Sequence, residues 1–225
     1  MICCPTVKTL LSQSKHALKT EEAAFKAGIK VYFVRHADKA VGNSYNARLR
    51  HQDQAISSRG RKQSKDIRKY FGNKGITSIF VSEYLRTTQT IAPLAKRLKI
   101  VPTVDPRLNE IDLGNIDGMT DEDFKAKYPH IWKAYQDRNA DFRWPGGETG
   151  SEAQARIVNF LEELKEKSGN CIAVAHDGVI RLLFCHLMQI PVYRRFDLQI
   201  GTACAMEIEW NQDRLQWNLL RYLAF

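Results

Sequence analysis

The sequence predicts an α/β protein, namely a three-layer α/β/α sandwich with a mostly parallel central sheet. Short apolar segments rich in β-formers alternate along the chain with longer segments whose apolar residues recur at helical spacing. This alternation is typical of a parallel sheet covered by helices on both faces. The chain has 225 residues, of which 44% are hydrophobic and 26% charged, so it can bury a core without disulfides.

The first half of the chain contains three expected strands and two expected helices. The strands are residues 30–34, 76–81 and 101–104. One helix begins at Ser57 or Ser58 and ends before Gly72, because serine favours a helix start and glycine a helix end. The other helix spans residues 87–98.

The second half is irregular in its middle and strongly patterned at its end. A loop over 109–118, a helix over 120–135 interrupted by Pro129, and a loop over 137–150 come first. Then follow a helix over 151–167, a strand over 171–175, a helix over 179–188 and a hairpin of strands 203–210 and 215–220. Ser151 and Gln154 have the spacing of a capping box. We expect one domain over 29–225 with a helical or loop cap at about 113–150.

The extension at residues 1–28 carries no recognisable targeting signal. Its apolar start is too short for a signal-peptide core, and Glu21 and Glu22 argue against a transit peptide. We expect a packing helix over 6–27, with lipidation at Cys3-Cys4 as the alternative. The five cysteines form no C-x-x-C pair, which favours reduced thiols and a cytoplasmic location. No uncharged apolar run approaches the roughly 18 residues of a membrane span.

The net charge is +9, from 34 basic and 25 acidic residues. This balance fits nucleic acid, a membrane surface or an anionic substrate, and charge alone does not choose among them. Since no nucleic-acid-binding module is recognisable and no apolar run could span a membrane, we expect neither nucleic acid nor a membrane as a partner. The oligomeric state is open, a homodimer included.

Two histidines directly follow two of the expected strands. His36 comes after Arg35 at the end of strand 30–34, and His176 comes after strand 171–175. Ligands in open α/β sheets bind beyond the carboxyl ends of strands, so parallel neighbours would bring both imidazoles into one crevice. Arg86 follows a third strand, 76–81, near a helix start. Two arginines and a helix N-terminus make a pocket for an anion such as phosphate.

These residues belong to six motifs that, in this order, resemble the histidine phosphatase superfamily, which includes the cofactor-dependent phosphoglycerate mutases. The motifs are Val34-Arg35-His36-Ala37, Ile56-Ser57-x-x-Gly60-x-x-Gln63, Ser82-x-x-Leu85-Arg86-Thr87-x-x-Thr90, Leu108-x-Glu110-x-x-x-Gly114-x-x-x-Gly118, Pro145-Gly146-Gly147-Glu148-Thr149 and Val174-Ala175-His176-Asp177-Gly178. The resemblance covers about residues 30–210 and implies a phosphoglycerate mutase-like fold.

The resemblance also implies a role for each matching residue. His36 would attack phosphorus and carry a phosphohistidine, while Arg35 and Arg86 bind the phosphate oxygens. His176 would hydrogen-bond the transferring phosphoryl group. Glu110 would protonate the leaving oxygen and then deprotonate the attacking water. No metal and no organic cofactor is implied.

The sequence departs from the family pattern in three places. Ala37 stands where a glycine is usual. The family often places a phosphate-contacting asparagine a few residues after its first histidine, and here Asn43, or alternatively Asn46, is the candidate. Asp177 adds a carboxylate beside His176, where it would either tune that histidine or repel one class of substrate.

The segment 113–145 bears on the reaction type. It is short and rich in aromatic residues, which resembles the small broad-specificity phosphatases more than the mutases with their longer insertion. Its aromatics either shape an apolar leaving-group pocket or only pack the cap. We therefore expect a metal-independent phosphomonoesterase of the histidine acid phosphatase type that acts on a small phosphorylated metabolite. The alternatives are a 2,3-bisphosphoglycerate-dependent mutase, a metal-dependent His-Asp phosphohydrolase and a non-catalytic phospho-ligand-binding protein.

Overall fold

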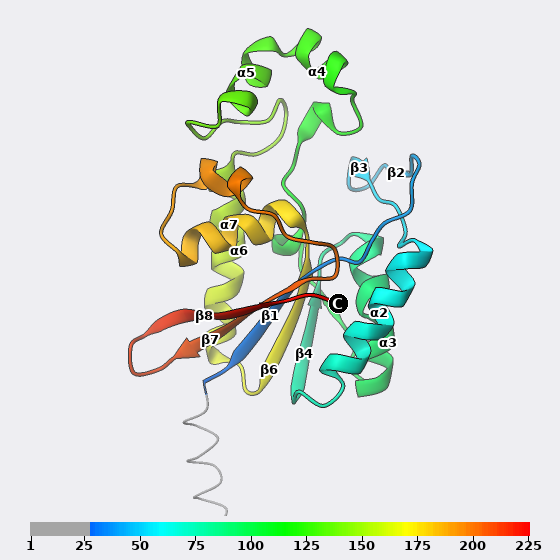
Figure 1. The fold of residues 1–225 in the computed structure, drawn as a ribbon, viewed down its shortest axis with the longest axis vertical. Helices are drawn as coiled ribbons and strands as arrows, with labels where there is room; N and C mark the ends of the chain where they lie inside the picture. Colours follow the sequence, from blue (N-terminus) through cyan, green and yellow to red (C-terminus); the bar gives the residue numbers. More distant parts are fainter. Residues whose placement is uncertain (1–27) are drawn as a thin grey trace, which may run out of the picture.

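The computed structural model of the chain describes residues 28–225, so the expected helix over 6–27 and the Cys3-Cys4 alternative lie outside the described residues. Its centre is a six-stranded sheet of order β5-β4-β6-β1-β7-β8 (Figure 1). The strands are β1 (Lys30–Arg35), β4 (Ile76–Val81), β5 (Thr103–Val104), β6 (Asn170–Ala175), β7 (Ala205–Asn211) and β8 (Gln216–Leu223). The first four run parallel, whereas β7 and β8 are antiparallel to their neighbours.

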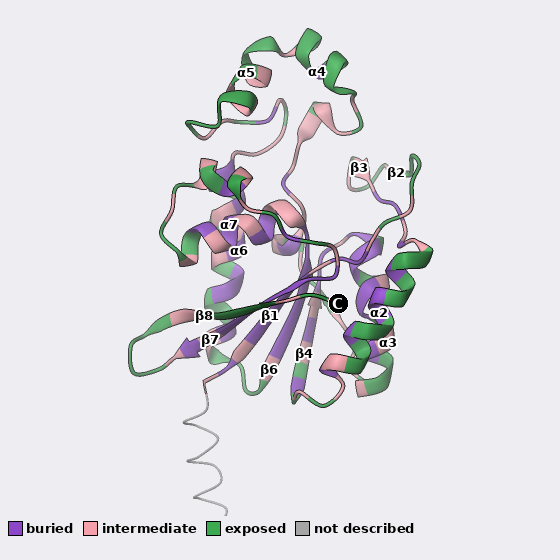
Figure 2. Cartoon of the chain, viewed as in Figure 1, coloured by how far each residue is buried: buried purple, intermediate pink, exposed green. Residues whose placement is uncertain are grey.

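Two helices cover each face of this sheet. The helices on one face are α2 (Ser58–Phe71) and α3 (Leu85–Leu98), and those on the other are α6 (Gly150–Glu163) and α7 (Asp177–Leu187) (Figure 1). Side chains of a strand alternate between faces, so Val31 and Phe33 of β1 pack toward α6 and α7, and Tyr32 and Val34 pack toward α2 and α3. The central strands β1, β6 and β7 are largely buried, whereas the edge strand β8 is mostly half-buried or exposed (Figure 2). The predicted three-layer sandwich is confirmed.

Several element boundaries differ from the sequence predictions. The capping box of α6 is Thr149 with Glu152, because the Glu152 amide donates to Thr149 Oγ1 at 3.0 Å and the Glu152 carboxylate accepts from the Thr149 amide at 2.9 Å. The capping box expected at Ser151 and Gln154 is therefore wrong. The helix itself ends at Glu163 and continues as the 3₁₀ turn η3 (Leu164–Glu166).

The segment above the carboxyl ends of the strands contains two short helices rather than one. They are α4 (Asp121–Lys127) and α5 (Pro129–Asp137), and they divide at Pro129, which has no amide hydrogen to continue the first helix. The 3₁₀ turns η1 (Pro106–Leu108) and η2 (Gly114–Ile116) lead into them, and a further one, η4 (Val192–Asp197), follows α7. We use the word cap for α4 and α5 together with the loops that connect them to the sandwich.

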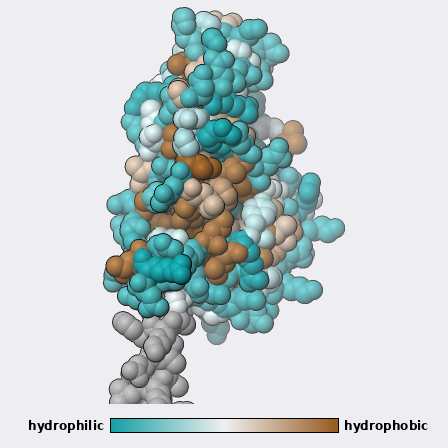
Figure 3. All heavy atoms as spheres, turned by 60° about the vertical axis from the view of Figure 1, so that its left-hand side comes forward, coloured by the Kyte–Doolittle hydropathy of each residue, from teal (hydrophilic) through white to brown (hydrophobic). Residues whose placement is uncertain are grey.

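A small hairpin faces the cap across the same end of the sheet. It consists of β2 (Tyr45–Asn46) and β3 (His51–Gln52), and the sequence patterns did not predict it (Figure 1). Hairpin and cap are largely exposed (Figure 2), and the outer surface of the cap is mainly hydrophilic, with apolar side chains gathered below it (Figure 3). None of the helices in residues 28–225 has the length and apolarity that crossing a membrane requires.

Candidate active site

The two histidines that end β1 and β6 lie side by side. The strands are parallel neighbours with Arg35 paired to Ala175, and the His36 amide donates to the Ala175 carbonyl at 3.0 Å. The ring centroids of His36 and His176 are 5.2 Å apart. Both rings are buried, with 5% and 0% of the residue exposed. The two imidazoles are therefore brought together as expected, and the sheet register sets their separation.

The hydrogen bonds of His36 determine which of its ring nitrogens is available. Nδ1 lies 2.8 Å from the Ala37 carbonyl oxygen, which can only accept, so Nδ1 carries the proton and Nε2 keeps its lone pair. The Ala37 amide in turn donates to Thr90 Oγ1 at 2.8 Å, which holds the backbone in place. Burial, with the nearby Arg86 charge, lowers the pKa of His36 to about 3. Near neutral pH this imidazole is therefore uncharged, which is the form that a nitrogen nucleophile needs.

Arg86 and His176 are held against each other at the start of α3. Arg86 Nη2 donates to His176 Nδ1 at 3.0 Å, and its Nη1 donates to the Gln52 carbonyl of the hairpin at 3.2 Å. His176 Nε2 lies 2.8 Å from Ser82 Oγ, so both ring nitrogens have protein partners. Burial lowers the pKa of His176 well below its usual value. A direct bond from His176 to a phosphoryl group therefore requires the exchange of one of these partners.

The two arginines offer hydrogen-bond donors to an anion. Within residues 28–225, the Nε atoms of Arg35 and Arg86 are buried and have no hydrogen-bond partner. Arg35 Nη1 donates to the Ile200 carbonyl, and it lies 3.6 Å from Asp177 Oδ2. An unpaired buried donor is costly, and oxygen atoms of a phosphate group suit planar guanidinium donors. The arrangement fits a dianionic phosphoryl group between the arginines and His36.

Glu110 lies at the N-terminus of α7. Its carboxylate accepts from the amides of Gly178 and Val179, both at 3.3 Å, and from the Ile111 amide at 2.9 Å. Glycine at position 178 leaves room for this carboxylate, since a Cβ there would lie 2.7 Å from Glu110 Oε1 and would displace it. Because a helix N-terminus favours an acidic group, this site suits the carboxylate of Glu110.

Glu110 borders two cavities of different character. One, of about 360 Å³, lies beneath the cap and also touches Asp177 and Gly178. Its apolar lining is Ile111, Leu113, Ile116, Met119, Phe124, Tyr135, Trp144 and Phe196. The other, of about 240 Å³, lies on the hairpin side and is mainly polar, with His51 and Arg156 among its lining. Within the part of the chain that the structure describes, no three histidine, cysteine or acidic side chains are placed to share a metal ion.

The remaining two candidates are placed differently from expectation. Asn43 is exposed in the loop before the hairpin, and no hydrogen bond of its side chain is present among the described residues. Asn46, the alternative, faces inward and donates to Asp53 Oδ2 at 3.1 Å, beside Arg86. Asp177 forms an ion pair with Arg181, with 2.7 Å between Oδ2 and Nη2, and lies near Arg35. Asp177 therefore lies at the site as a partner of two arginines. Its carboxylate would repel a phosphate group and is not a phosphate ligand.

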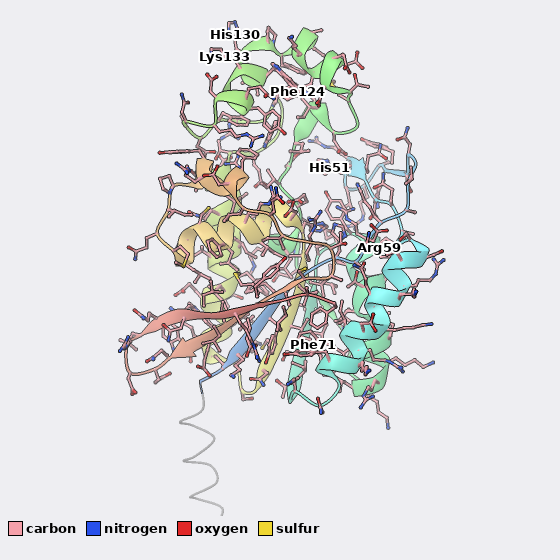
Figure 4. The ribbon with its side chains drawn as sticks, in the orientation of Figure 1. His51, Arg59, Phe71, Phe124, His130 and Lys133 are labelled. Atoms are coloured by element: carbon pink, nitrogen blue, oxygen red, sulfur yellow. The ribbon has the colours of Figure 1, made fainter. Side chains whose placement is uncertain are left out.

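Sequence reasoning did not single out His51 as a functional residue. It stands on the hairpin facing the base of the cap (Figure 4), with Nε2 3.2 Å from Asp112 Oδ1 and Nδ1 3.4 Å from Asp117 Oδ2. The hydrogen bond with Asp117, followed by the Asp112 charge, raises the pKa of His51. Its partners are more than sixty residues away along the chain, so no local pattern could reveal it.

Known proteins resemble the chain over most of its length. Residues 31–222 match the model of the histidine phosphatase superfamily (branch 1). Phosphoserine phosphatase 1 of Hydrogenobacter thermophilus is 28% identical over 191 residues, which are 83% of this chain and 89% of that protein. The probable phosphoglycerate mutase GpmB of an Enterobacter species is 27% identical over 195 residues, covering 82% of this chain and 86% of that protein. The structure of a mycobacterial glucosyl-3-phosphoglycerate phosphatase complexed with VO3 superposes with a TM-score of 0.71 at 26% identity, covering 88% of this chain and all of that one.

Proposed function

The chain belongs to the histidine phosphatase superfamily, and from this premise we propose that it hydrolyses phosphomonoesters through a phosphohistidine formed on His36. One observation carries the proposal. The imidazole of His36 is uncharged, its Nδ1 donates to the Ala37 carbonyl, and it lies near two arginines whose Nε donors have no partner within residues 28–225. These are the requirements for a nitrogen nucleophile beside a phosphoryl group.

The reaction proceeds in two steps. His36 Nε2 forms a bond to phosphorus while the bond from phosphorus to the alcohol oxygen breaks, and protonated Glu110 gives its proton to the departing oxygen. Water then attacks the phosphohistidine, Glu110 takes up a proton from it, and the P–N bond breaks to release inorganic phosphate. Arg35 and Arg86 stabilise the charge on the phosphoryl oxygens in both steps. His176 orients Arg86 and contributes a bond to the phosphoryl group after exchanging a partner.

We assign the leaving group to the larger cavity, beneath a cap formed by about residues 113–150. That cavity begins at Glu110, the proposed proton donor, and its apolar lining suits an alcohol with an apolar body. The substrate is a small phosphorylated metabolite, as the relatives named as phosphatases support. The second candidate is a phosphoglycerate mutase, supported by the relative of that name. A mutase would convert 3-phosphoglycerate only with its 2,3-bisphosphate primer, so assays with and without the primer separate the two.

Trapping the intermediate tests the proposal. A radiolabelled phosphomonoester, quenched in alkali during turnover, should leave an acid-labile label on the chain, and EDTA should leave turnover unchanged. His36→Ala should remove the label and lower kcat by about 10⁴-fold or more. His186→Ala, at an exposed histidine of α7, is the matched control and should keep both. A label that persists in His36→Ala would assign the nucleophile to another residue.

A further inference from the structure

Arg156 lies on α6 and makes five hydrogen bonds, three to carbonyls of the segment around Glu110 and two to the Glu148 carboxylate. Its Nη1 donates to the carbonyls of Arg107 and Asn109, both at 2.7 Å, and its Nη2 donates to the Glu110 carbonyl at 3.0 Å. The Glu148 carboxylate accepts from Nη2 at 2.6 Å and from Nε at 3.1 Å. A guanidinium group has five N–H donors, so the five bonds can employ every one of them.

Glu148 completes the attachment on the other side of Glu110. Its carboxylate accepts from the Asp112 amide at 2.9 Å, and its own amide donates to the Asp112 carbonyl at 3.0 Å. Arg156 and Glu148 therefore hold the backbone both before and after Glu110. Their side chains are only 21% and 18% exposed, so water competes weakly for these bonds.

The segment 109–112 has no regular secondary structure of its own that would fix it. Its carboxylate is bound by the amides at the start of α7, whereas its backbone is bound by α6 through Arg156. The position of the Glu110 carboxylate thus depends on two helices at once. The bonds from the α7 amides to the carboxylate are long. Without the attachment to α6, the carboxylate could therefore move away from these amides.

We propose that Arg156, paired with Glu148, is a positioning residue that sets the Glu110 carboxylate for proton transfer to the leaving group. The inference rests on the proposed function, because it assumes that Glu110 is the proton donor. Lysine could not replace Arg156, because a single ammonium group cannot hydrogen-bond to three carbonyls and a carboxylate at once. A purely structural role would lower kcat for all substrates alike. A positioning role predicts a loss of kcat that is confined to substrates whose leaving group needs a proton.

Two substrates with nearly the same aromatic body provide the test. 4-Nitrophenyl phosphate has a good leaving group, whereas 4-nitrobenzyl phosphate releases an alcohol that needs a proton. In Arg156→Met, kcat for the benzyl ester should fall by about 10²-fold more than kcat for the phenyl ester. In a Glu110→Gln background the same substitution should leave the ratio of the two kcat values unchanged, because the donor is already lost.

Arg107→Met is the matched control. The side chain of Arg107, which precedes this segment, also contacts α6 through Glu163 and Asn159, but within residues 28–225 it makes no hydrogen bond to residues 109–112. Its loss should leave the ratio of the two kcat values at the wild-type value. If Arg156→Met fails to fold, Glu148→Gln tests the same attachment and should change the ratio in the same direction.

Two results would overturn the inference. One is an equal loss on both esters in Arg156→Met and in Glu148→Gln, and the other is a further change of the ratio in the Glu110→Gln background. Failure of the proposed function looks different, because wild-type protein would then leave no acid-labile label and hydrolyse neither ester. That result removes the premise and overturns the inference with it.

Discussion

The floor and the rim of the site are built in different ways. The floor, which we define as His36, Arg86 and His176, is at most 6% exposed and lies at the ends of neighbouring parallel strands. The rim, defined as the β2–β3 hairpin and the cap, is largely exposed, and its two parts are joined by polar contacts such as those of His51. Sheet register fixes the floor, whereas individual side chains hold the rim. We infer that the floor determines the chemistry and the rim the choice of leaving group.

Removing an arginine from the floor should have the largest effect. Arg86→Met should lower kcat/KM by about 10²- to 10³-fold and weaken inhibition by vanadate, because one set of phosphate donors is lost. Lys133→Met on the exposed side of the cap (Figure 4) removes the same charge from the rim. It should leave vanadate inhibition unchanged. Equal weakening in both variants would mean that net charge, not the floor geometry, binds the anion.

Shortening an apolar side chain of the rim should change the choice of substrate more than the rate of the chemical step. Phe124 is 5% exposed and packs against Trp132, with ring centroids 5.4 Å apart, and against Trp144 at 6.0 Å. Phe124→Ala should raise KM for 4-nitrobenzyl phosphate about 10-fold, because apolar contacts with the leaving group are lost. Vanadate inhibition should not change. The exposed His130→Ala on α5 is the control, and a shift of vanadate inhibition in Phe124→Ala would place the cap in the phosphate site (Figure 4).

The contrast between floor and rim also explains which parts of the structure could be predicted from the sequence. The strands, the helices beside them and the adjacent histidines follow from local periodicity and from strand ends, so they were predicted. The hairpin was missed because it pairs only two residues on each strand and depends on Asp117, which accepts from the Gln52 amide at 2.7 Å. Arg156 was not singled out from the sequence, since its carbonyl partners lie 46 to 49 residues away. Bonds of that range leave no local pattern.

The spacing of a capping box occurs twice near the start of α6, and only the pair of Ser151 and Gln154 was predicted from the sequence. Thr149 with Glu152 and Ser151 with Gln154 both have capping-box spacing, and tertiary contacts decide between them. Asp141 accepts from the amides of Gly150 and Ser151, at 3.0 and 2.8 Å, which places both residues inside the first turn. Gly150 also packs against Arg195, where a Cβ would lie 2.6 Å from the guanidinium. The start of α6 is therefore set by Asp141 and Arg195. Both residues lie outside the helix, so the local sequence pattern does not include them.

The smallest expected effect is on how stability depends on pH, and its sign separates floor from rim. The pKa of His36, ordinarily 6.5, is lowered to about 3 in the folded protein, so between these values the unfolded chain binds more protons. The free energy of unfolding should therefore fall on acidification below pH 6.5, by about 1.4 kcal/mol per pH unit from this residue. The pKa of His51 is raised, so its contribution is present at low pH and is lost as pH rises through that pKa.

Urea unfolding at pH 7.5 and pH 5.5 measures both contributions. The difference between the two free energies should be smaller in His36→Asn than in the wild type by about 1 kcal/mol, because one proton-binding difference is removed. It should be larger in His51→Gln, because a group that gains stability on acidification is lost. An unchanged difference in His36→Asn would mean that His36 is not buried in its neutral form. The sheet register would then not be sufficient to prepare the nucleophile, and the division between floor and rim would lose its main support.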